Sequence, residues 1–279
     1  MPSRASRHPT AARQHLWWGA NGQPFQWASF PFADVSRSLV NRLPGHREIC
    51  TKTRLAVNLR EYAAKHLRKG GEDGRAFFPL TFVVHAGRRT PELDAFKRAA
   101  AGPSGTSNAS EKEARTRGVW IVKPGASNRG RGIEVFDSVP AVEKHLAAQE
   151  YGSQWIVQKY IEKPILVHGR KFDIRQFALV DPEGAVYVYR DSYVRTCSAA
   201  YDVNNLDDKA IHLTNDAVQK VLDSYGEHED ANKLDFDEFQ AALDADHASG
   251  AQRKVDFEND VWPAMVEAVT HVFSATLDG

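Results

Sequence analysis

The sequence predicts an α+β fold, and two kinds of pattern support this class. Short β-like runs such as VWIVKP, GIEVF and QWIVQKYI alternate with segments whose apolar residues recur at helical spacing. Two alternating runs, RKFDIRQFALV and AVYVYRDSYVRTC, flank the turn signal DPEG at Asp181–Gly184 and predict a β-hairpin. Helices mixed with hairpins favour α+β over a regular parallel βαβ repeat.

The predicted elements follow one another along the chain. TKTRLAVNLREYAAKHL has Leu55, Leu59 and Tyr62 at helical spacing, and RKGGEDGRAFFPLTFVV predicts a glycine-rich loop that enters a strand at Phe77–Val84. VPAVEKHLAAQ and DAVQKVLDSYG predict helices. The stretch from Glu227 is charged, and the apolar spacing of VWPAMVEAVTHVFSATLDG after it predicts a C-terminal helix.

Composition divides the chain into a lead and three lobes. Residues 1–26 carry arginine and serine but no acid and no clear amphipathic pattern, so we expect a flexible lead. Residues 99–118 are rich in Gly, Ser and Ala and predict a mobile connection. The expected lobes are an N-terminal α/β lobe (27–76), a central lobe (77–168) that contains this connection, and a C-terminal lobe (169–279).

Global composition excludes several functional classes. The 36 basic residues balance 36 acidic residues, so the net charge points to no nucleic acid and no membrane partner. No apolar stretch approaches the roughly 20 residues that a membrane helix needs. Cys50 and Cys197 lie far apart and in no metal-type spacing, which favours a reduced intracellular protein and argues against a zinc site.

The segment WIVKPGASNRGRGIEVF, Trp120–Phe136, has the residues of an anion-binding loop. Glycine and small residues between two strands let backbone N–H groups approach an anion closely. Lys123 can reach a phosphate as a point charge, and Arg129 and Arg131 can bind phosphate oxygens in bidentate fashion. An exposed basic hairpin turn explains the same residues, and no Gly-Lys-Ser/Thr opens a helix as in a P-loop.

One strand face carries a second group of charges. In RKFDIRQF, Lys171, Asp173 and Arg175 share one face, opposite the apolar neighbours. YRDSYVRTC places Arg190 and Arg195 on the expected partner strand. This pattern predicts either a surface that binds polyanions or a ladder of charges that faces solvent.

Two further polar segments stand near these strands. QKYIEKP, Gln158–Pro164, follows a buried strand and could offer main-chain groups to a purine, although a plain strand end has the same pattern. HLTN, His212–Asn215, adds short polar groups that can orient phosphates or metal-bound water. A histidine such as His212 is by itself more often structural.

These segments, in this order and at these spacings, resemble the tubulin–tyrosine ligase-like family of ATP-grasp ligases. The resemblance rests on WIVKPGASNRGRGI, QKYIEKPILVHGRKFDIRQFALV, YRDSYVRT and HLTN, and on LVNRLPGHREICTKTRLAVNL, which is similar to the family's N-terminal segment. It covers about residues 27–279 and implies an ATP-grasp-type fold. KPGASNRGRGIEV, FDIRQF, YRDSYVR and NNLDDKAIHLTN are most similar to the glycylase branch.

The resemblance implies ATP-dependent ligation of an amino acid to the acidic C-terminal tails of tubulin or microtubules. A tail glutamate would be phosphorylated to an acyl phosphate, and the amino group of free glycine, or of glutamate in a glutamylase, would displace the phosphate. ATP and Mg²⁺ are the implied cofactors, because such chemistry needs cations where negative charge develops. The implied locations are the cytoplasm and cytoskeleton, including the cilium or flagellar axoneme.

The resemblance also implies roles for individual residues. Lys123 would contact the nucleotide phosphates, and Arg175 and Arg195 would be the catalytic residues that stabilise the acyl phosphate and bind the carboxylate of the amino acid. The other nucleotide-binding residues would be Arg129, Gly130, Arg131 and Gly132 in the closing loop, Gln158, Lys159, Tyr160 and Ile161 at the adenine, and Lys171, Asp173, Thr214 and Asn215 along the nucleotide.

One departure from the family pattern bears on activity. The family holds magnesium with an aspartate and a late Glu-x-Asn pair, and nothing of that kind follows Val255. We therefore expect a fragment that lacks the C-terminal strands of the core, with no metal ligand assigned and poor catalysis. The alternatives to a glycylase are a tubulin glutamylase and a non-catalytic microtubule-binding pseudoenzyme.

The segment EHEDANKLDFDEF, Glu227–Phe239, resembles the exit of an EF-hand with Glu238 in the twelfth place. Ala231 replaces a ligand, and Asn232 stands where glycine makes the sharp turn. A single degenerate loop of this kind predicts an acidic surface insertion rather than a calcium site.

Overall fold

A computed structural model describes residues 16–17, 39–41, 43, 45–66, 77–102, 118–181 and 183–277. The chain forms two compact units, residues 1–48 and 49–279. In the first unit β1 (Leu16–Trp17) and β2 (Leu39–Val40) form a parallel pair. The predicted lead at 1–26 and the predicted connection at 99–118 lie outside the described residues, apart from β1, residues 99–102 and Gly118.

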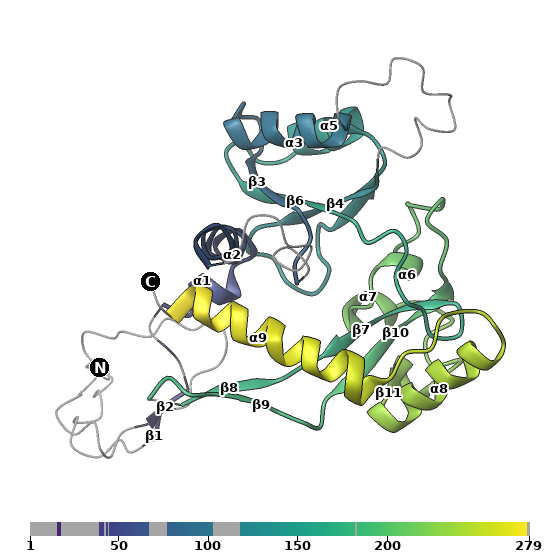
Figure 1. The fold of residues 1–279 in the computed structure, drawn as a ribbon. Coiled ribbons are helices and arrows are strands. Elements are labelled where there is room, and N and C mark those ends of the chain that lie inside the picture. The colour runs from purple at the N-terminus through teal and green to yellow at the C-terminus, as the bar shows by residue number, and fades with distance from the viewer. Residues whose placement is uncertain are drawn as a thin grey trace, which may run out of the picture. The chain divides into compact units, whose positions relative to one another are not determined.

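The second unit contains a four-stranded antiparallel sheet with strand order β3-β6-β4-β5. Two helices, α3 and α5, cover one face of this sheet (Figure 1). The core on that face joins Phe96 of α3 and Val142 of α5 to Val84, Val122 and Val157 of the strands, all fully buried. The elements of this layer are β3 (Thr81–His85), α3 (Pro91–Ala101), β4 (Trp120–Pro124), β5 (Glu134–Phe136), α5 (Val139–Ala147) and β6 (Gln154–Lys159).

Local sequence explains where these elements begin. Thr90 accepts a hydrogen bond from Leu93 N at 3.2 Å as the N-cap of α3, and Pro91 follows at the first helical position. The strand predicted from Phe77 begins only at Thr81. Pro79 explains the later start, because proline has no N–H for a sheet ladder. The helix predicted at VPAVEKHLAAQ and the strand at QWIVQKYI are confirmed as α5 and β6.

A second antiparallel sheet has the order β11-β10-β7, and β8 pairs with β9 in a separate ribbon. The ribbon confirms the predicted hairpin at DPEG, where Gly184 N donates to Asp181 O at 3.1 Å. The elements are β7 (Arg170–Arg175), β8 (Ala178–Val180), β9 (Val186–Val188), β10 (Tyr193–Ala200), α6 (Lys209–His212), α7 (Asp216–Gln219), the 3₁₀ turn η6 (Asp230–Asn232) and β11 (Lys233–Leu234).

Helix α8 (Phe236–Ala248) covers the apolar face of this second sheet. Phe172 and Ile174 of β7 pack there against Phe239 and Leu243 of α8. Because side chains alternate along a strand, Lys171 and Asp173 then lie on the opposite face. This confirms the period-two interpretation of RKFDIRQF for these two residues.

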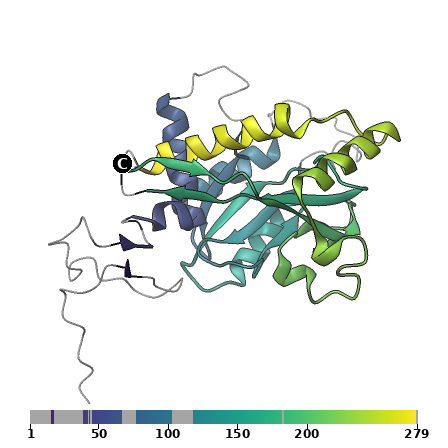
Figure 2. The ribbon, with the colours of Figure 1, turned by 90° about the horizontal axis from the view of Figure 1, so that it is seen from below.

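The chain continues from a π-helical turn, η7 (Phe257–Val261), into the predicted C-terminal helix, α9 (Trp262–Leu277). Helix α9 packs along α2 (Lys52–His66), which follows the short helix α1 (Arg47–Cys50), and runs beside the β8–β9 ribbon (Figures 1 and 2). The helix predicted at TKTRLAVNLREYAAKHL is therefore confirmed. In the described part of the chain, no helix has both the length and the apolar character to cross a bilayer.

Two of the sequence predictions are wrong in detail. The helix predicted over DAVQKVLDSYG ends after one turn at Gln219, and Val221 beyond it is 79% exposed. The exposure of Val221 shows that the apolar residues of this segment do not all face one side of a helix. Arg190 precedes β10 instead of belonging to it, and its guanidinium pairs with Glu258 and lies 4.2 Å from the ring centre of Trp262.

Candidate functional site

Lys123 lies on the face of the first sheet that α3 and α5 do not cover. Its neighbours Trp120 and Val122 point into the core beneath the helices, so alternation along β4 turns Lys123 the other way. Its Nζ donates to Gln158 Oε1 at 2.8 Å, and Gln158 Nε2 donates to Thr81 Oγ1 at 2.8 Å. Three adjacent strands therefore hold this ammonium group in one position.

Two more lysines surround Lys123. Burial, together with the positive charges of Lys171 and Lys52, lowers the pKa of Lys123 to about 8. Burial also lowers the pKa values of Lys171 and Lys52. Three cations that repel one another inside the protein form a site that an anion would stabilise.

Lys52 is a member of this group that sequence reasoning missed. It begins α2, its backbone N donates to Gly125 O at 3.0 Å, and its Nζ donates to Ser127 O. Both acceptors belong to the glycine-rich loop after β4. The lysine of TKTRL carries no sequence signal of this role, because the contact joins positions far apart in the chain.

The loop itself turns through left-handed backbone conformations. Arg129, Gly130 and Gly132 have φ values of 59°, 73° and 71°. A Cβ at Gly130 would lie 2.8 Å from Val218 Cγ2 and 3.2 Å from Asn215 Oδ1, so the loop touches the start of α7. The structure thus brings the predicted residues Gly130 and Asn215 together, while Arg129 and Arg131 are exposed.

A chain of hydrogen bonds fixes Lys171 on the second sheet. Its Nζ donates to Tyr160 Oη and to His212 O, both at 2.9 Å. His212 Nε2 lies 2.8 Å from Asn205 O, a pure acceptor, so Nε2 carries the hydrogen and Nδ1 accepts from Tyr160 Oη at 2.8 Å. Burial lowers the pKa of His212, in agreement with a neutral ring and with the structural role considered from the sequence.

Asp173 and Arg195 form a bidentate pair next to Lys171. Arg195 Nε and Nη2 donate to the two carboxylate oxygens of Asp173 at 2.8 and 2.7 Å, and Thr214 Oγ1 donates to Asp173 Oδ2 at 2.6 Å. The hydrogen bond that Arg195 donates to Asp173 is the main reason why the pKa of Arg195 is raised. Three residues predicted from separate motifs therefore form one network.

Three other predicted residues lie apart from this group. Arg175 is exposed at the end of β7, with its guanidinium 5.2 Å from the ring centre of Phe177. Lys159 projects to the helix-covered face of the first sheet, where it pairs with Glu162 and lies 5.7 Å from the ring centre of Trp120. Ile161 is 58% exposed. The side chain of Lys159 therefore does not face the site side of the sheet.

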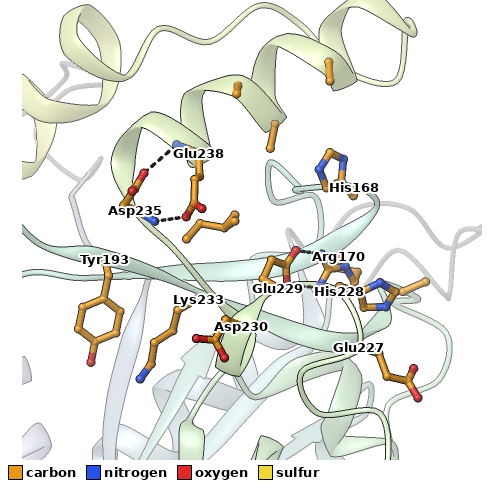
Figure 3. A pocket seen from close by; sticks show the side chains of 15 residues that line it. His168, Arg170, Tyr193, Glu227, His228, Glu229, Asp230, Lys233, Asp235 and Glu238 are labelled. Atoms are coloured by element: carbon orange, nitrogen blue, oxygen red, sulfur yellow. Dashed lines mark hydrogen bonds and ion pairs between the residues drawn. The ribbon is translucent and has the colours of Figure 1, made fainter.

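A large groove in the described part of the chain lies elsewhere. It has a volume of about 1380 Å³ beside α8, and it is lined by none of the predicted site residues. Figure 3 shows that charges within it pair with one another, as Arg170 does with Glu229. We therefore place the candidate site at Lys52, Lys123 and Lys171, called the lysine group below, because of their chemistry and not because of cavity size.

The degenerate EF-hand segment lines this same groove. Asp235 Oδ1 accepts from Glu238 N at 2.8 Å, and Glu238 Oε2 accepts from Asp235 N at 2.9 Å (Figure 3). The two acids form a capping box at the start of α8, so the glutamate in the twelfth place stabilises a helix end.

The arrangement can bind a multiply charged anion and orient a carboxylate. Lys52, Lys123 and Lys171 supply positive charge. The Nε and Nη2 groups of Arg195 bind Asp173, and its Nη1 donates to no residue that the structure describes, so Nη1 can donate to a carboxylate or phosphate oxygen. The glycine-rich loop borders the same region through Lys52 and Asn215.

Comparisons with known proteins agree with this chemistry. The chain matches the model of the "Tubulin-tyrosine ligase family" over residues 34–275. Tubulin glycylase 3B of Tetrahymena thermophila is 38% identical over 117 residues, which are 41% of this chain and 10% of that protein. Tubulin monoglycylase TTLL3 of Homo sapiens is 36% identical over 171 residues, 58% of this chain and 21% of that protein. Probable alpha-tubulin polyglutamylase Ttll1 of Tetrahymena thermophila is 31% identical over 212 residues, 68% of this chain and 47% of that protein.

The extent of these matches determines what they establish. The chain spans between a tenth and about half of the length of these three relatives. The family model, by contrast, covers well over half of this chain and includes every predicted site residue. On this evidence the chain belongs to the tubulin-tyrosine ligase family.

Proposed function

We propose that this chain is an ATP-dependent ligase that attaches glycine to glutamate side chains in the acidic tails of tubulin, and that its two sheets form an ATP-grasp-type core. The convergence of three lysines from α2, β4 and β7 carries this proposal. The glycylase relatives favour glycine as the amino acid added. The same relatives support an association with the cytoskeleton.

ATP would bind as a co-substrate at the lysine group. Lys123 and Lys171 would contact its phosphates, with Lys52 as a third cation, and the glycine-rich loop from Gly125 to Gly132 would cover them. The main chain after β6, at Tyr160 and Ile161, would lie at the adenine. Cations held in place before the reaction stabilise negative charge as it develops, without a cost of reorganisation.

The carboxylate chemistry would fall to Arg195 and its network. A glutamate carboxylate of the tail would take the γ-phosphoryl group of ATP and release ADP. The glycine amine would then attack the carbonyl carbon and displace phosphate, forming an amide and releasing a proton. Arg195 would bind the glycine carboxylate or the acyl phosphate once Asp173 and Thr214 have positioned it.

Magnesium does not fit the described residues in the same way. In the portion of the chain that the structure describes, no three His, Cys, Asp or Glu side chains gather as a metal site. Asp173, two residues after Lys171 and on the same face of β7, is already bound to Arg195 and Thr214. We therefore assign Mg²⁺ no ligand and derive no step through it.

A glutamylase is the second candidate. The polyglutamylase relative matches a larger share of this chain than the glycylases do, 68% against 41% and 58%. Glutamate has a second carboxylate, which needs a further cation in the site. Arg175 forms no ion pair with any residue that the structure describes, so it would be available to bind this carboxylate.

The test is an incorporation assay with the full chain, MgATP, tubulin and either labelled glycine or labelled glutamate. We expect label from glycine, dependent on ATP and absent with tubulin whose acidic tails have been removed by proteolysis. Incorporation of glutamate alone would support the second candidate. Incorporation of neither amino acid, in a chain that is folded and binds nucleotide, would contradict a ligase activity for this chain.

A further inference from the structure

The side chain of Tyr160 joins the two halves of the candidate site. Tyr160 follows β6 and is 5% exposed, and its backbone N donates to Val119 O at 2.9 Å, which ties it to the first sheet. Its hydroxyl contacts Lys171 of the second sheet and His212 of α6. No role in the proposed reaction has yet required this hydroxyl.

The hydrogen bonds through Tyr160 can run in only one direction. Asn205 O can only accept, so His212 donates from Nε2 and accepts at Nδ1. The hydrogen of the Tyr160 hydroxyl therefore points to His212, and its oxygen lone pair faces Lys171. The carbonyl of Asn205 thus orients His212, and His212 orients the Tyr160 hydroxyl, so that the Tyr160 oxygen accepts from Lys171.

Lys171 has three N–H donors, and the described residues use two of them. One donates to Tyr160 Oη and one to His212 O, both at 2.9 Å, and Nζ also lies 4.4 Å from the ring centre of Tyr160. We propose that Tyr160 is a positioning residue whose hydroxyl and ring hold the Lys171 ammonium so that its third N–H faces a bound phosphate. The consequence for nucleotide binding rests on the proposed function, whereas the positioning of Lys171 does not.

Several groups decide how Lys171 titrates. Burial lowers its pKa, while Cys197 on β10 and Asp173 on its own strand act in the opposite direction. The other groups that face it are Lys123, Tyr160 and His212. The Tyr160 oxygen accepts a stronger hydrogen bond from the ammonium than from the neutral amine, so its loss would lower the pKa of Lys171 further.

The first test measures Lys171 directly in the full chain without any nucleotide. Competitive acetylation with acetic anhydride across a pH series, read peptide by peptide by mass spectrometry, reports the titration of each lysine. In Tyr160→Phe we expect the midpoint of Lys171 to fall by about half to one pH unit. Lys144, exposed on α5, is the internal reference and should not change.

Tyr225→Phe is the matched control, because its buried hydroxyl has no hydrogen-bond partner among the described residues. It should leave the Lys171 midpoint unchanged. His212→Leu gives a second route to the same result, since it removes the acceptor that orients the Tyr160 hydroxyl. An unshifted Lys171 midpoint in a folded Tyr160→Phe or His212→Leu protein overturns the proposal.

The second test is a double-mutant cycle on the affinity for the non-hydrolysable ATP analogue AMPPNP. Tyr160→Phe should weaken binding about three- to tenfold in the otherwise unchanged chain and have no effect beside Lys171→Met. An equal loss in both backgrounds would mean that Tyr160 acts independently of Lys171 and would overturn the proposal. If the unchanged chain does not bind AMPPNP, the proposed function fails, and the labelling result alone decides the role of Tyr160.

Discussion

The buried charge of Lys123 destabilises the folded chain and, in the proposed function, helps to bind an anion. Burial lowers its pKa to about 8, so at neutral pH the folded chain carries a charge that its surroundings disfavour. Between pH 8 and the ordinary lysine value the folded state binds fewer protons than the unfolded state. The buried charge of Lys123 therefore lowers the free energy of unfolding by its full amount below about pH 8, and this loss is relieved as the pH rises above 8.

We predict that Lys123→Met weakens AMPPNP binding about 10- to 100-fold, because a charge-assisted hydrogen bond is lost. The free energy of unfolding at pH 7 should stay unchanged or rise by up to about 2 kcal/mol, since the buried charge costs more than the Gln158 hydrogen bond contributes. In the unchanged chain, nucleotide affinity should fall as the pH rises through about 8. Isothermal titration and urea unfolding measure both effects, with Lys144→Met as the exposed control.

Unchanged affinity in Lys123→Met would remove this residue from the site. A large loss of stability would show instead that the Gln158 contact outweighs the burial of charge.

At the scale of elements, the glycine-rich loop depends on its fit against α7. Gly130 has φ of 73°, where an L side chain costs about 1 kcal/mol, and it lies against Val218 and Asn215. The sequence pattern predicted a glycine-rich loop that could approach an anion closely. The close approach to α7 depends on a helix more than 80 positions further along the chain.

We predict that Gly130→Ala lowers the free energy of unfolding by about 1–3 kcal/mol, since backbone strain and a steric overlap add. Gly169→Ala is the matched control, with the same φ of 73° and no atom within 4 Å of the added Cβ. It should cost only about 1 kcal/mol. Urea unfolding of the two variants compares them, and equal losses would mean that the contact with α7 does not matter for stability.

At the scale of the whole second unit, a buried ion pair joins the second sheet to the segment before β11. Arg170 of β7 donates to Glu229 Oε2 at 3.0 Å and to Cys197 O at 3.1 Å, and Thr196 Oγ1 donates to Glu229 Oε2 at 2.8 Å. Burial by itself raises the pKa of Glu229, but the hydrogen bonds from Arg170 and Thr196 outweigh it and lower that pKa.

We predict that Glu229→Leu destabilises the chain by about 3–5 kcal/mol, because Arg170 is left buried without its partner. Arg170→Met combined with Glu229→Leu should recover most of that loss. In the unchanged chain the stabilisation from Glu229 is present above the ordinary pKa of glutamate and is lost as the pH falls through the lower, folded value. Thermal unfolding across acidic pH measures this, and a double variant no more stable than Glu229→Leu alone would contradict the explanation.

Sequence patterns predicted the elements whose apolar spacing is regular. α2, α5, α9, β6 and the β8–β9 hairpin are where the sequence placed them, because each buries a continuous apolar face or follows a strong turn signal. α8 was not predicted, although the Asp235–Glu238 pair has the spacing of a capping box. Its charged composition concealed the apolar stripe of Phe239 and Leu243 that packs on the second sheet.

The residue types of the site, and the family to which the chain belongs, followed from the sequence alone. Motifs of charged and glycine residues in a fixed order carry that information, since each motif is local. Their grouping was decided by the tertiary structure. Folding brings Lys52 to Lys123, sets Arg195 on Asp173 and turns Lys159 away, because strand pairing and burial determine which face each side chain occupies.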